Sequence, residues 1–337
     1  MAEKIIVSCA VVAACAVLTA VLILALMPTL QRHFIAIPNE RSSHKSAVPQ
    51  AAGLAIMAAM LAVYVALWAL GHLEASAPSP ISVLSAAVGL TLLGALDDAM
   101  SLPVSWRFAG QAAAAILIVL GLPDSFQILP GAMPLAVERL LLVIGTVAFI
   151  NAVNFLDGID WITVAQTVPM TLGIIALGYL GAVPDNVALL ALVLLGGVLG
   201  FAVFNKHPAR IFLGDAGSLP IGLCLAWMLI FVARADIVAA LLLPLYTLSD
   251  SGLTLGRRIA NGEKIFSPHR SHFYQRALTL GFKAPDVTTR IFILGSLLAV
   301  LAVIAAVTNS PLLDVALLLV GAGATGILLR ILARGRV

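Results

Sequence analysis

The sequence predicts an all-α integral membrane protein, a polytopic bundle of about eleven transmembrane helices. Three observations lead to this fold class. Hydrophobic residues make up 61% of the 337 residues and charged residues only 10%, whereas a soluble domain carries about 25% charge. Apolar runs of about 20 residues, long enough to cross a bilayer, recur along the whole chain. Lysine and arginine concentrate in alternate connections between these runs.

The first span begins near the N-terminus, because its apolar run is too long for the hydrophobic region of a signal peptide. The outer connections are short and contain Gly and Pro, as is typical of tight turns. The longest polar segment, Gly256–Pro285, is too short for a separate globular domain, so residues 1–337 are expected to form a single polytopic membrane domain. The expected spans lie at about 5–28, 51–70, 81–97, 107–121, 136–154, 162–181, 186–204, 215–232, 236–254, 288–307 and 311–331.

The basic residues give the orientation. Of the 19 lysines and arginines, all but Lys4, Arg139 and Arg234 lie in the odd-numbered connections or at the C-terminus. The positive-inside rule therefore predicts an outside N-terminus and a cytoplasmic C-terminus. The pI of about 8.9 does not indicate nucleic-acid binding, because the basic residues are scattered and form no long run. The three cysteines lie in apolar stretches and have the spacing of neither a metal site nor a disulfide framework.

Every dense polar cluster lies on the cytoplasmic side. The first is Pro38–Gly53, whose basic residues, Lys45 among them, either orient the protein or contact anionic lipid. The second is Asp97–Asp98, which ends the third span and is followed by Arg107. Adjacent carboxylates at a helix C-terminus repel each other and oppose the helix dipole, so they indicate a divalent cation or a cationic ligand. The alternative is a pair of aspartates solvated at the membrane interface.

The third cluster, NAVNFLDGID, ends the fifth span. Asn151 and Asn154 are one helical turn apart and share a face. Gly158 loosens the backbone, so we expect Asp157 and Asp160 to turn toward a common ligand. Because polar groups at this depth are costly unless they serve a purpose, the stretch predicts a functional site rather than a helix end that merely emerges into water.

The last two clusters flank the eighth and ninth spans. Asp215, in IFLGDAGS, begins the eighth span among small residues that let backbone N–H groups approach an anion, although alone it would suit a simple helix cap. His269, Arg270 and His272 lie in SPHRSHFYQR after the ninth span. Zinc is disfavoured there because no further ligand is nearby. The setting favours a bound pyrophosphate, with a purely structural loop as the alternative.

In these motifs the chain resembles the polyprenyl-phosphate N-acetylhexosamine-1-phosphate transferase superfamily, glycosyltransferase family 4. The resemblance rests on NAVNFLDGID, FLGDAGSLPIG, the LDD that ends a span and the HRSH loop, which occur in matching order over roughly residues 38 to 276. Members start lipid intermediates of O-antigen, teichoic acid, peptidoglycan and N-glycans. The HRSHFYQR form resembles the branch that serves surface polysaccharide (O-antigen-like) assembly. The sequence departs from the family at Pro49–Gly53, where a Gly-Gly pair is usual, and at Arg107, where the family has lysine.

The resemblance implies a site on the cytoplasmic face of a bacterial inner membrane, with Mg²⁺ or Mn²⁺ as cofactor. It implies that undecaprenyl phosphate and a UDP-N-acetylhexosamine are the substrates. The identity of the sugar is open among N-acetylglucosamine, N-acetylfucosamine and N-acetylquinovosamine, and the oligomeric state is open, a homodimer being one option. The implied roles are catalysis for Asp97, Asp98, Asp157 and Asp160, metal binding for Asp215 and Asp98, and substrate binding for Lys45, Arg107, Asn151, Asn154, His269, Arg270 and His272.

The expected reaction is attack of the lipid phosphate on the β-phosphorus of the UDP-sugar, with release of UMP. The second pKa of a phosphate monoester is near 6, so at neutral pH this nucleophile needs little help from a base. A two-step route through a phosphorylated aspartate is an open alternative. A secondary transporter is the rival class, but transporters place ionisable groups near the midplane at a repeat interface, and this sequence shows no repeat. A lipid-binding scaffold would explain the basic loops but not the ordered acidic and amide motifs.

Overall fold

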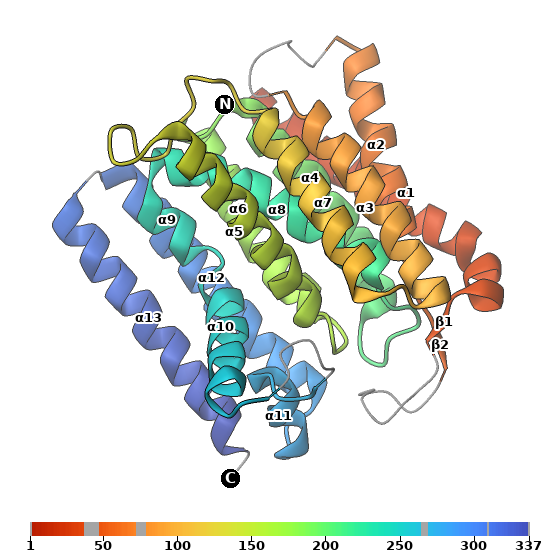
Figure 1. Ribbon diagram of the computed structural model, residues 1–337. Helices are drawn as coiled ribbons and strands as arrows, with labels where there is room; N and C mark the ends of the chain where they lie inside the picture. The colour runs from red at the N-terminus through yellow and green to blue at the C-terminus, as the bar shows by residue number, and fades with distance from the viewer. Residues whose placement is uncertain (1, 37–46, 72–78, 264–268, 309, 336–337) are drawn as a thin grey trace.

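The computed structural model describes residues 2–36, 47–71, 79–263, 269–308 and 310–335. The described chain is almost wholly helical, which confirms the predicted fold class (Figure 1). A single two-stranded antiparallel pair, β1 (Ile35–Ala36) with β2 (Val48–Pro49), follows the first helix. The helices are α1 (Ala2–His33), α2 (Gly53–Ala69), α3 (Ile81–Met100), α4 (Val104–Leu120), α5 (Leu135–Phe155), α6 (Ile162–Tyr179), α7 (Asp185–Asn205), α8 (Asp215–Ala235), α9 (Ile237–Leu242), α10 (Leu245–Ala260), α11 (Phe273–Thr279), α12 (Ala284–Thr308) and α13 (Pro311–Arg334).

Within the described ranges, 8 helices are long and apolar enough to cross a membrane, and α2 and α4 are shorter apolar helices. The expected ninth span, 236–254, differs from the prediction because it is divided between α9 and α10. Pro244 lies at the break, where it lacks an N–H and its ring would clash with the carbonyl four residues earlier in a continuous helix. The α9–α10 pair and these ten helices correspond to the eleven predicted spans.

Helix α10 buries its polar side chains and exposes its apolar ones, the reverse of a surface helix in a water-soluble protein. Its buried side chains are mostly polar, whereas large aliphatic side chains are exposed. Such a helix is stable where its surroundings are apolar, so the pattern supports a membrane location for α10. The buried polar residues are Thr247, Asp250, Thr254 and Arg258, and the exposed aliphatic ones are Leu248, Leu253, Leu255 and Ile259.

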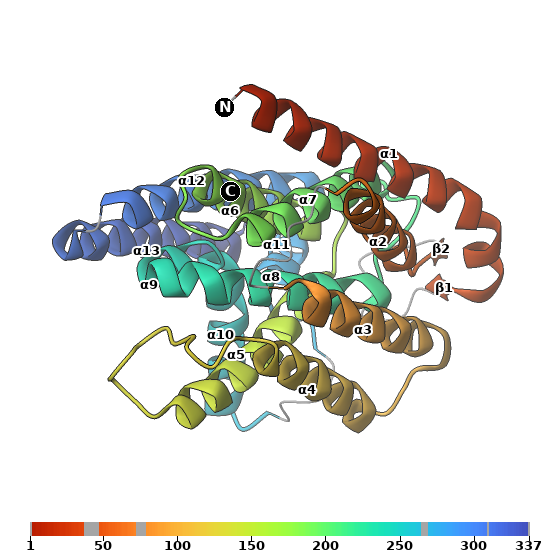
Figure 2. The same ribbon diagram turned by 90° about the horizontal axis from the view of Figure 1, so that it is seen from above.

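The centre of the bundle is formed by α6, α7 and α8, which are more buried than α1, α12 and α13 at the periphery. Figure 2 shows α1 along one side of the bundle and α12 with α13 at another. In Figure 1 the N-terminus lies at one end of the bundle and the C-terminus at the opposite end, as the predicted topology requires. The end of the bundle at which the C-terminus lies also carries the last turns of α3 and α5, the first turn of α8, and α11.

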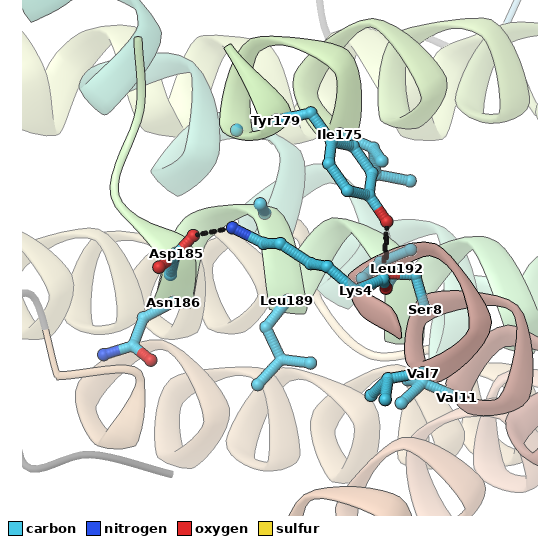
Figure 3. A pocket seen from close by; sticks show the side chains of 12 residues that line it. Lys4, Val7, Ser8, Val11, Ile175, Tyr179, Asp185, Asn186, Leu189 and Leu192 are labelled. Atoms are coloured by element: carbon cyan, nitrogen blue, oxygen red, sulfur yellow. Dashed lines mark hydrogen bonds and ion pairs between the residues drawn. The ribbon is translucent and has the colours of Figure 1, made fainter. Parts of the chain in front are cut away.

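A hollow of about 310 Å³ lies at the other end of the molecule, between the first turns of α1 and α7 and the last turn of α6 (Figure 3). Lys4 and Asp185 form an ion pair of 2.8 Å at this hollow, and the Tyr179 hydroxyl donates a hydrogen bond of 2.6 Å to Ser8. None of the residues that line this hollow belongs to the acidic motifs, so it is not the candidate active site.

Candidate functional site

An acidic cluster forms where the last turns of α3 and α5 meet the first turn of α8. Asp97 and Asp98 come from α3, Asn154 comes from α5, and Asp215 is the first residue of α8. Helices α3 and α8 cross closely at Gly94, where a Cβ atom would lie 2.3 Å from the backbone of Asp215. The absence of a side chain at this crossing lets the two acidic segments come together.

Asp98 acts as the cap of α8. Its Oδ1 accepts the backbone N–H of Asp215 at 3.0 Å, and its Oδ2 accepts the N–H of Ala216 at 3.1 Å. The residue in the N-cap position, Gly214, has no side chain with which to do this. The sequence alone would allow Asp215 to cap its own helix, but it does not. Instead, the Asp98 carboxylate from α3 accepts two of the N–H groups that have no partner within the helix at its start.

Arg107 lies between two carboxylates. Its Nη1 is 3.2 Å from Oδ2 of Asp97 and 3.6 Å from Oδ2 of Asp215. The second oxygen of Asp97 accepts the backbone N–H of Leu102 at 2.6 Å, which fixes the turn between α3 and α4. A planar guanidinium with several N–H groups suits such a bridge, whereas the lysine usual in the resembled family would offer a single point charge.

The two asparagines of α5 reach inward to different helices. The Asn154 side chain donates to Oδ1 of Asp215 and to the hydroxyl of Ser218, both at 2.8 Å. The Asn151 side chain donates to Gln111 of α4 at 2.5 Å. Asn154 is thus in position to orient the Asp215 carboxylate directly, whereas Asn151 joins α5 to α4 through a partly buried amide pair.

Asp157 lies in the connection from α5 to α6 and accepts a hydrogen bond from the Thr163 hydroxyl. Burial raises the pKa of Asp157 from 3.8 to about 7; the Thr163 hydrogen bond opposes this shift and the negative charge of Asp215 adds to it. A carboxyl group with such a pKa is only partly ionised at neutral pH, and a nearby cation would favour its charged form.

Asp160 has different partners from Asp157. Its Oδ2 contacts Nδ1 of His207 at 2.7 Å and accepts the backbone N–H of Ala209 at 3.1 Å. That Gly158 lets both aspartates turn toward a common ligand stays a prediction. Gly158 is needed for another reason, because a Cβ atom there would lie 2.1 Å from the Tyr274 hydroxyl.

The histidine-containing loop packs against the same stretch. The Tyr274 hydroxyl donates to the backbone carbonyl of Phe155 at 3.0 Å. The rings of His269 and His272 have centroids 5.0 Å apart, and the Phe155 ring is 6.0 Å from that of His272. The side chain of Arg270 is exposed. The fold thus brings the ninth-connection motif next to the end of α5, as a shared substrate site requires.

His269 is held in one neutral form. Burial, then the neighbouring His272 ring and the positive charge of Arg258, lowers the pKa of His269 to about 4. Its Nδ1 lies 2.8 Å from the Ser271 hydroxyl and accepts the Ser271 backbone N–H at 3.4 Å. With Nδ1 acting as an acceptor, the ring proton is on Nε2, which can donate to an anion.

Sequence reasoning missed several residues of this region. Asp250, which is fully buried, binds the His272 ring, and His207 and Thr163 hold the two aspartates of the central stretch. A lone carboxylate inside the apolar run expected to be the ninth span was the signal for Asp250. Lys45, expected to bind substrate, lies outside the described residues.

The cluster suits a hard divalent cation. Arg107 bridges the side chains of Asp97 and Asp215, and Asp157 is close enough to Asp215 for their charges to interact. Within the described ranges no group of three or more acidic, His or Cys side chains forms a ready metal site. Mg²⁺ characteristically binds to one or two carboxylates and completes its shell with substrate phosphates and water, so oxygen ligands with excess negative charge fit it. The oxygens of Asp98 accept two backbone N–H groups, while Asp215 accepts from Asn154 and faces Arg107, so both expected ligands are held in place by their partners.

Comparison with known proteins agrees with this geometry. The family described as Glycosyl transferase family 4 matches residues 80–233, which run from the start of α3 to the end of α8. A decaprenyl-phosphate N-acetylglucosaminephosphotransferase of Mycobacterium leprae is 30% identical over 292 residues, covering 77% of this chain and 73% of the relative. A probable undecaprenyl-phosphate N-acetylglucosaminyl 1-phosphate transferase of Bacillus subtilis is 28% identical, with 84% and 81% covered. A phospho-N-acetylmuramoyl-pentapeptide-transferase of Deinococcus radiodurans is 33% identical, with 58% and 69% covered.

Proposed function

We propose a reaction for this chain, which belongs to glycosyl transferase family 4 and has polyprenyl-phosphate N-acetylhexosamine-1-phosphate transferases as homologues. In this reaction the protein transfers N-acetylhexosamine 1-phosphate from a UDP-sugar to undecaprenyl phosphate. A bond forms between a lipid phosphate oxygen and the β-phosphorus, the bond from that phosphorus to the bridging oxygen breaks, and UMP leaves. The product is undecaprenyl-pyrophosphoryl-N-acetylhexosamine.

One observation carries the proposal: an acidic and amide cluster lies beside a loop of histidine and arginine at one end of a membrane bundle. Two anionic phosphates must be brought together in this reaction, so catalysis depends on positioning and on neutralising charge. A site at the end of the helices can admit a lipid phosphate from the membrane and a nucleotide from water. The midplane sites of transporters do not offer this double access.

The chain's own residues divide this work. Arg107, which already bridges Asp97 and Asp215, is the cation placed to contact a phosphate oxygen within the acidic cluster. Neutral His269 donates its Nε2–H to the diphosphate, and the exposed guanidinium of Arg270 contacts the same anion. Asn154 keeps Asp215 in one orientation.

Mg²⁺ or Mn²⁺, when bound, supplies charge stabilisation on the diphosphate oxygens and on the departing UMP. Asp215 would hold it together with Asp97 or Asp98, whose carboxylates lie beside it at the start of α8. Asp157, with its raised pKa, is a nearby carboxyl group whose charged form the arrival of a cation would favour.

We place the site on the cytoplasmic face of a bacterial inner membrane, since the positively charged connections lie at the same end of the bundle. The donor is then a cytosolic UDP-sugar, and the product initiates a cell-surface polysaccharide such as an O-antigen. A homodimer is compatible with this scheme, which needs only one copy of the chain per site.

An exchange assay tests the proposal. Membranes that contain the protein are incubated with radiolabelled UMP, undecaprenyl phosphate, Mg²⁺ and one UDP-N-acetylhexosamine at a time. We expect label to appear in the UDP-sugar for at least one sugar of the panel. The Asp185→Asn variant, altered at an exposed residue of the opposite end, serves as the matched active control, and Asp215→Asn as the inactive one. Absence of exchange with every sugar in a correctly inserted protein would contradict the proposed reaction.

A further inference from the structure

Asp250 is the most deeply buried carboxylate near the candidate site. It lies on α10 with no exposed surface, although a carboxylate is costly to bury unless its oxygens are fully paired. No role follows for it from the acidic cluster, because it comes from a different helix and faces the histidine-containing loop. Its environment therefore requires an explanation of its own.

Five donors converge on the two oxygens of Asp250. Oδ1 accepts from the backbone N–H of Phe273 at 3.0 Å, from the Thr254 hydroxyl at 3.4 Å and from the His272 ring at 3.1 Å. Oδ2 accepts from the Tyr246 hydroxyl at 3.0 Å and from the backbone N–H of Tyr274 at 3.3 Å. A carboxylate, which can only accept, matches a surrounding of five donors.

The contact with His272 fixes where its ring proton lies. The atom that faces Asp250 is Nδ1, so Nδ1 must carry the proton that the carboxylate accepts. In the neutral ring Nε2 is then an acceptor. Within the described part of the chain, no hydrogen-bond partner of Nε2 is found, and the His272 side chain is only 4% exposed.

The two histidines of the loop thereby have opposite hydrogen-bonding character. His269 uses Nδ1 as the acceptor from Ser271 and presents Nε2–H, whereas His272 uses Nδ1–H as the donor and presents the Nε2 lone pair. Their rings are 5.0 Å apart. The Nε2–H of His269 can donate to a phosphate oxygen. The Nε2 lone pair of His272 can accept from a substrate N–H or O–H group, or take up a proton.

The same carboxylate also sets the position of the loop. Two of its contacts are to the first backbone N–H groups of α11, which holds Tyr274 in place. Tyr274 in turn contacts the carbonyl of Phe155 and the backbone of Gly158, next to Asp157. Asp250 therefore links the orientation of His272 to the docking of α11 against the end of α5.

We propose that Asp250 is a positioning residue, which holds His272 as the tautomer protonated at Nδ1 and presents Nε2 as an acceptor to the sugar nucleotide. The inference rests on the proposed function for its kinetic consequence alone. A carboxylate behind a histidine fixes the tautomer and the ring orientation, and loss of such a partner elsewhere costs about 10- to 100-fold in activity.

The first test measures the tautomer without any reaction. The protein is labelled with ¹⁵N-histidine, reconstituted in membranes at about pH 8, and its ring nitrogens are recorded by solid-state NMR. The chain has 6 histidines, and His272 is assigned by loss of its signals in His272→Gln. We expect a protonated Nδ1 and an unprotonated Nε2 for His272. The reverse pattern in the unaltered protein would overturn the proposal, whether or not the enzyme transfers any sugar.

The second test replaces Asp250 with Asn, which keeps the shape but removes the negative charge that favours a proton on Nδ1 of His272. We expect the His272 proton to move to Nε2 and kcat/KM for the UDP-sugar to fall about tenfold or more. Tyr246→Phe is the matched control, since it removes a donor to Oδ2 and leaves the His272 contact intact. We expect this control to keep the original tautomer and to lose less than about threefold in kcat/KM.

Three outcomes separate the readings. A folded Asp250→Asn protein with the original tautomer and unchanged kcat/KM overturns the proposal. Equal losses in Asp250→Asn and Tyr246→Phe, with no change of tautomer in either, would show a merely structural role and also overturn it. Lack of transfer by the unaltered protein would contradict the proposed function, while the NMR result would still decide the role of Asp250.

Discussion

Because Asp98 caps α8, we expect Asp98→Ala to be less stable than Asp215→Asn, which the motifs alone would not suggest. Asp98→Ala removes acceptors from the N–H groups of Asp215 and Ala216, at 3.0 and 3.1 Å. Each net hydrogen bond contributes about 0.5–1.5 kcal/mol, and loss of a helix cap costs about 0.5–2 kcal/mol, so we expect a destabilisation of about 1–3 kcal/mol. The corresponding fall in Tm is about 2–4 °C for each kcal/mol in a domain of roughly 200 residues, and a little less here.

Asp215→Asn should behave in the opposite way. Its backbone N–H still donates to Asp98, and the new side-chain oxygen can still accept from Asn154. The lost contact with Arg107 is at 3.6 Å with a one-third exposed guanidinium, so it contributes less than about 1 kcal/mol. Turnover, however, should fall at least about a hundredfold, since a charge required for cation binding is removed.

The assay pairs thermal unfolding in detergent, followed by intrinsic fluorescence, with UMP exchange under saturating Mg²⁺. We expect Asp98→Ala to melt several degrees below the unaltered protein, and Asp215→Asn to melt within about 2 °C of it. Asp185→Asn, altered at the opposite end, should change neither quantity. An Asp215→Asn protein that melts as low as Asp98→Ala, or an Asp98→Ala protein with an unaltered Tm, would refute the reasoning from the cap.

Four further outcomes follow from the site and the topology. His269→Ala and His272→Ala should each raise the KM for the UDP-sugar about tenfold, and unchanged kinetics in both would favour a structural loop. Activity should disappear in excess EDTA and return with Mg²⁺ or Mn²⁺; full turnover with the chelator would remove the cation from the reaction. A cysteine placed at Ala132 should react with impermeant thiol reagents from outside intact cells and one at Lys283 should not, and the reverse pattern would invert the topology. Because the folded pKa of Asp157 is raised to about 7, the folded protein loses stability as pH rises from about 4 through 7. In EDTA, Asp157→Asn should therefore have a higher Tm than the unaltered protein at about pH 8 and an equal one near pH 4, and a pH-independent difference would contradict this assignment.

The membrane-spanning helices could be predicted from the sequence because transfer into lipid depends on local composition. Every expected span begins or ends within a few residues of a helix in the structure, except at Pro244, where a single residue without an N–H divides the ninth. The residue types in the acidic, amide and histidine motifs also indicated the chemistry, because carboxylates and amides are rarely retained at the ends of spans without a purpose. The family comparison agrees with that reading.

The partner of each polar side chain was decided by the tertiary structure. Asp98 and Asp215 are 117 residues apart, and only the close crossing of α3 with α8 makes one the cap of the other. Asp160 contacts His207 because the connection before α8 folds back over the start of α6. In the sequence Asp250 is a lone carboxylate in an apolar run, and only the packing of the segment that leads into α11 shows that its partner is His272. Composition determines which segments enter the membrane, since hydrophobic transfer is additive and local, whereas hydrogen-bond partners depend on distances of a few ångströms between helices, which only their packing sets.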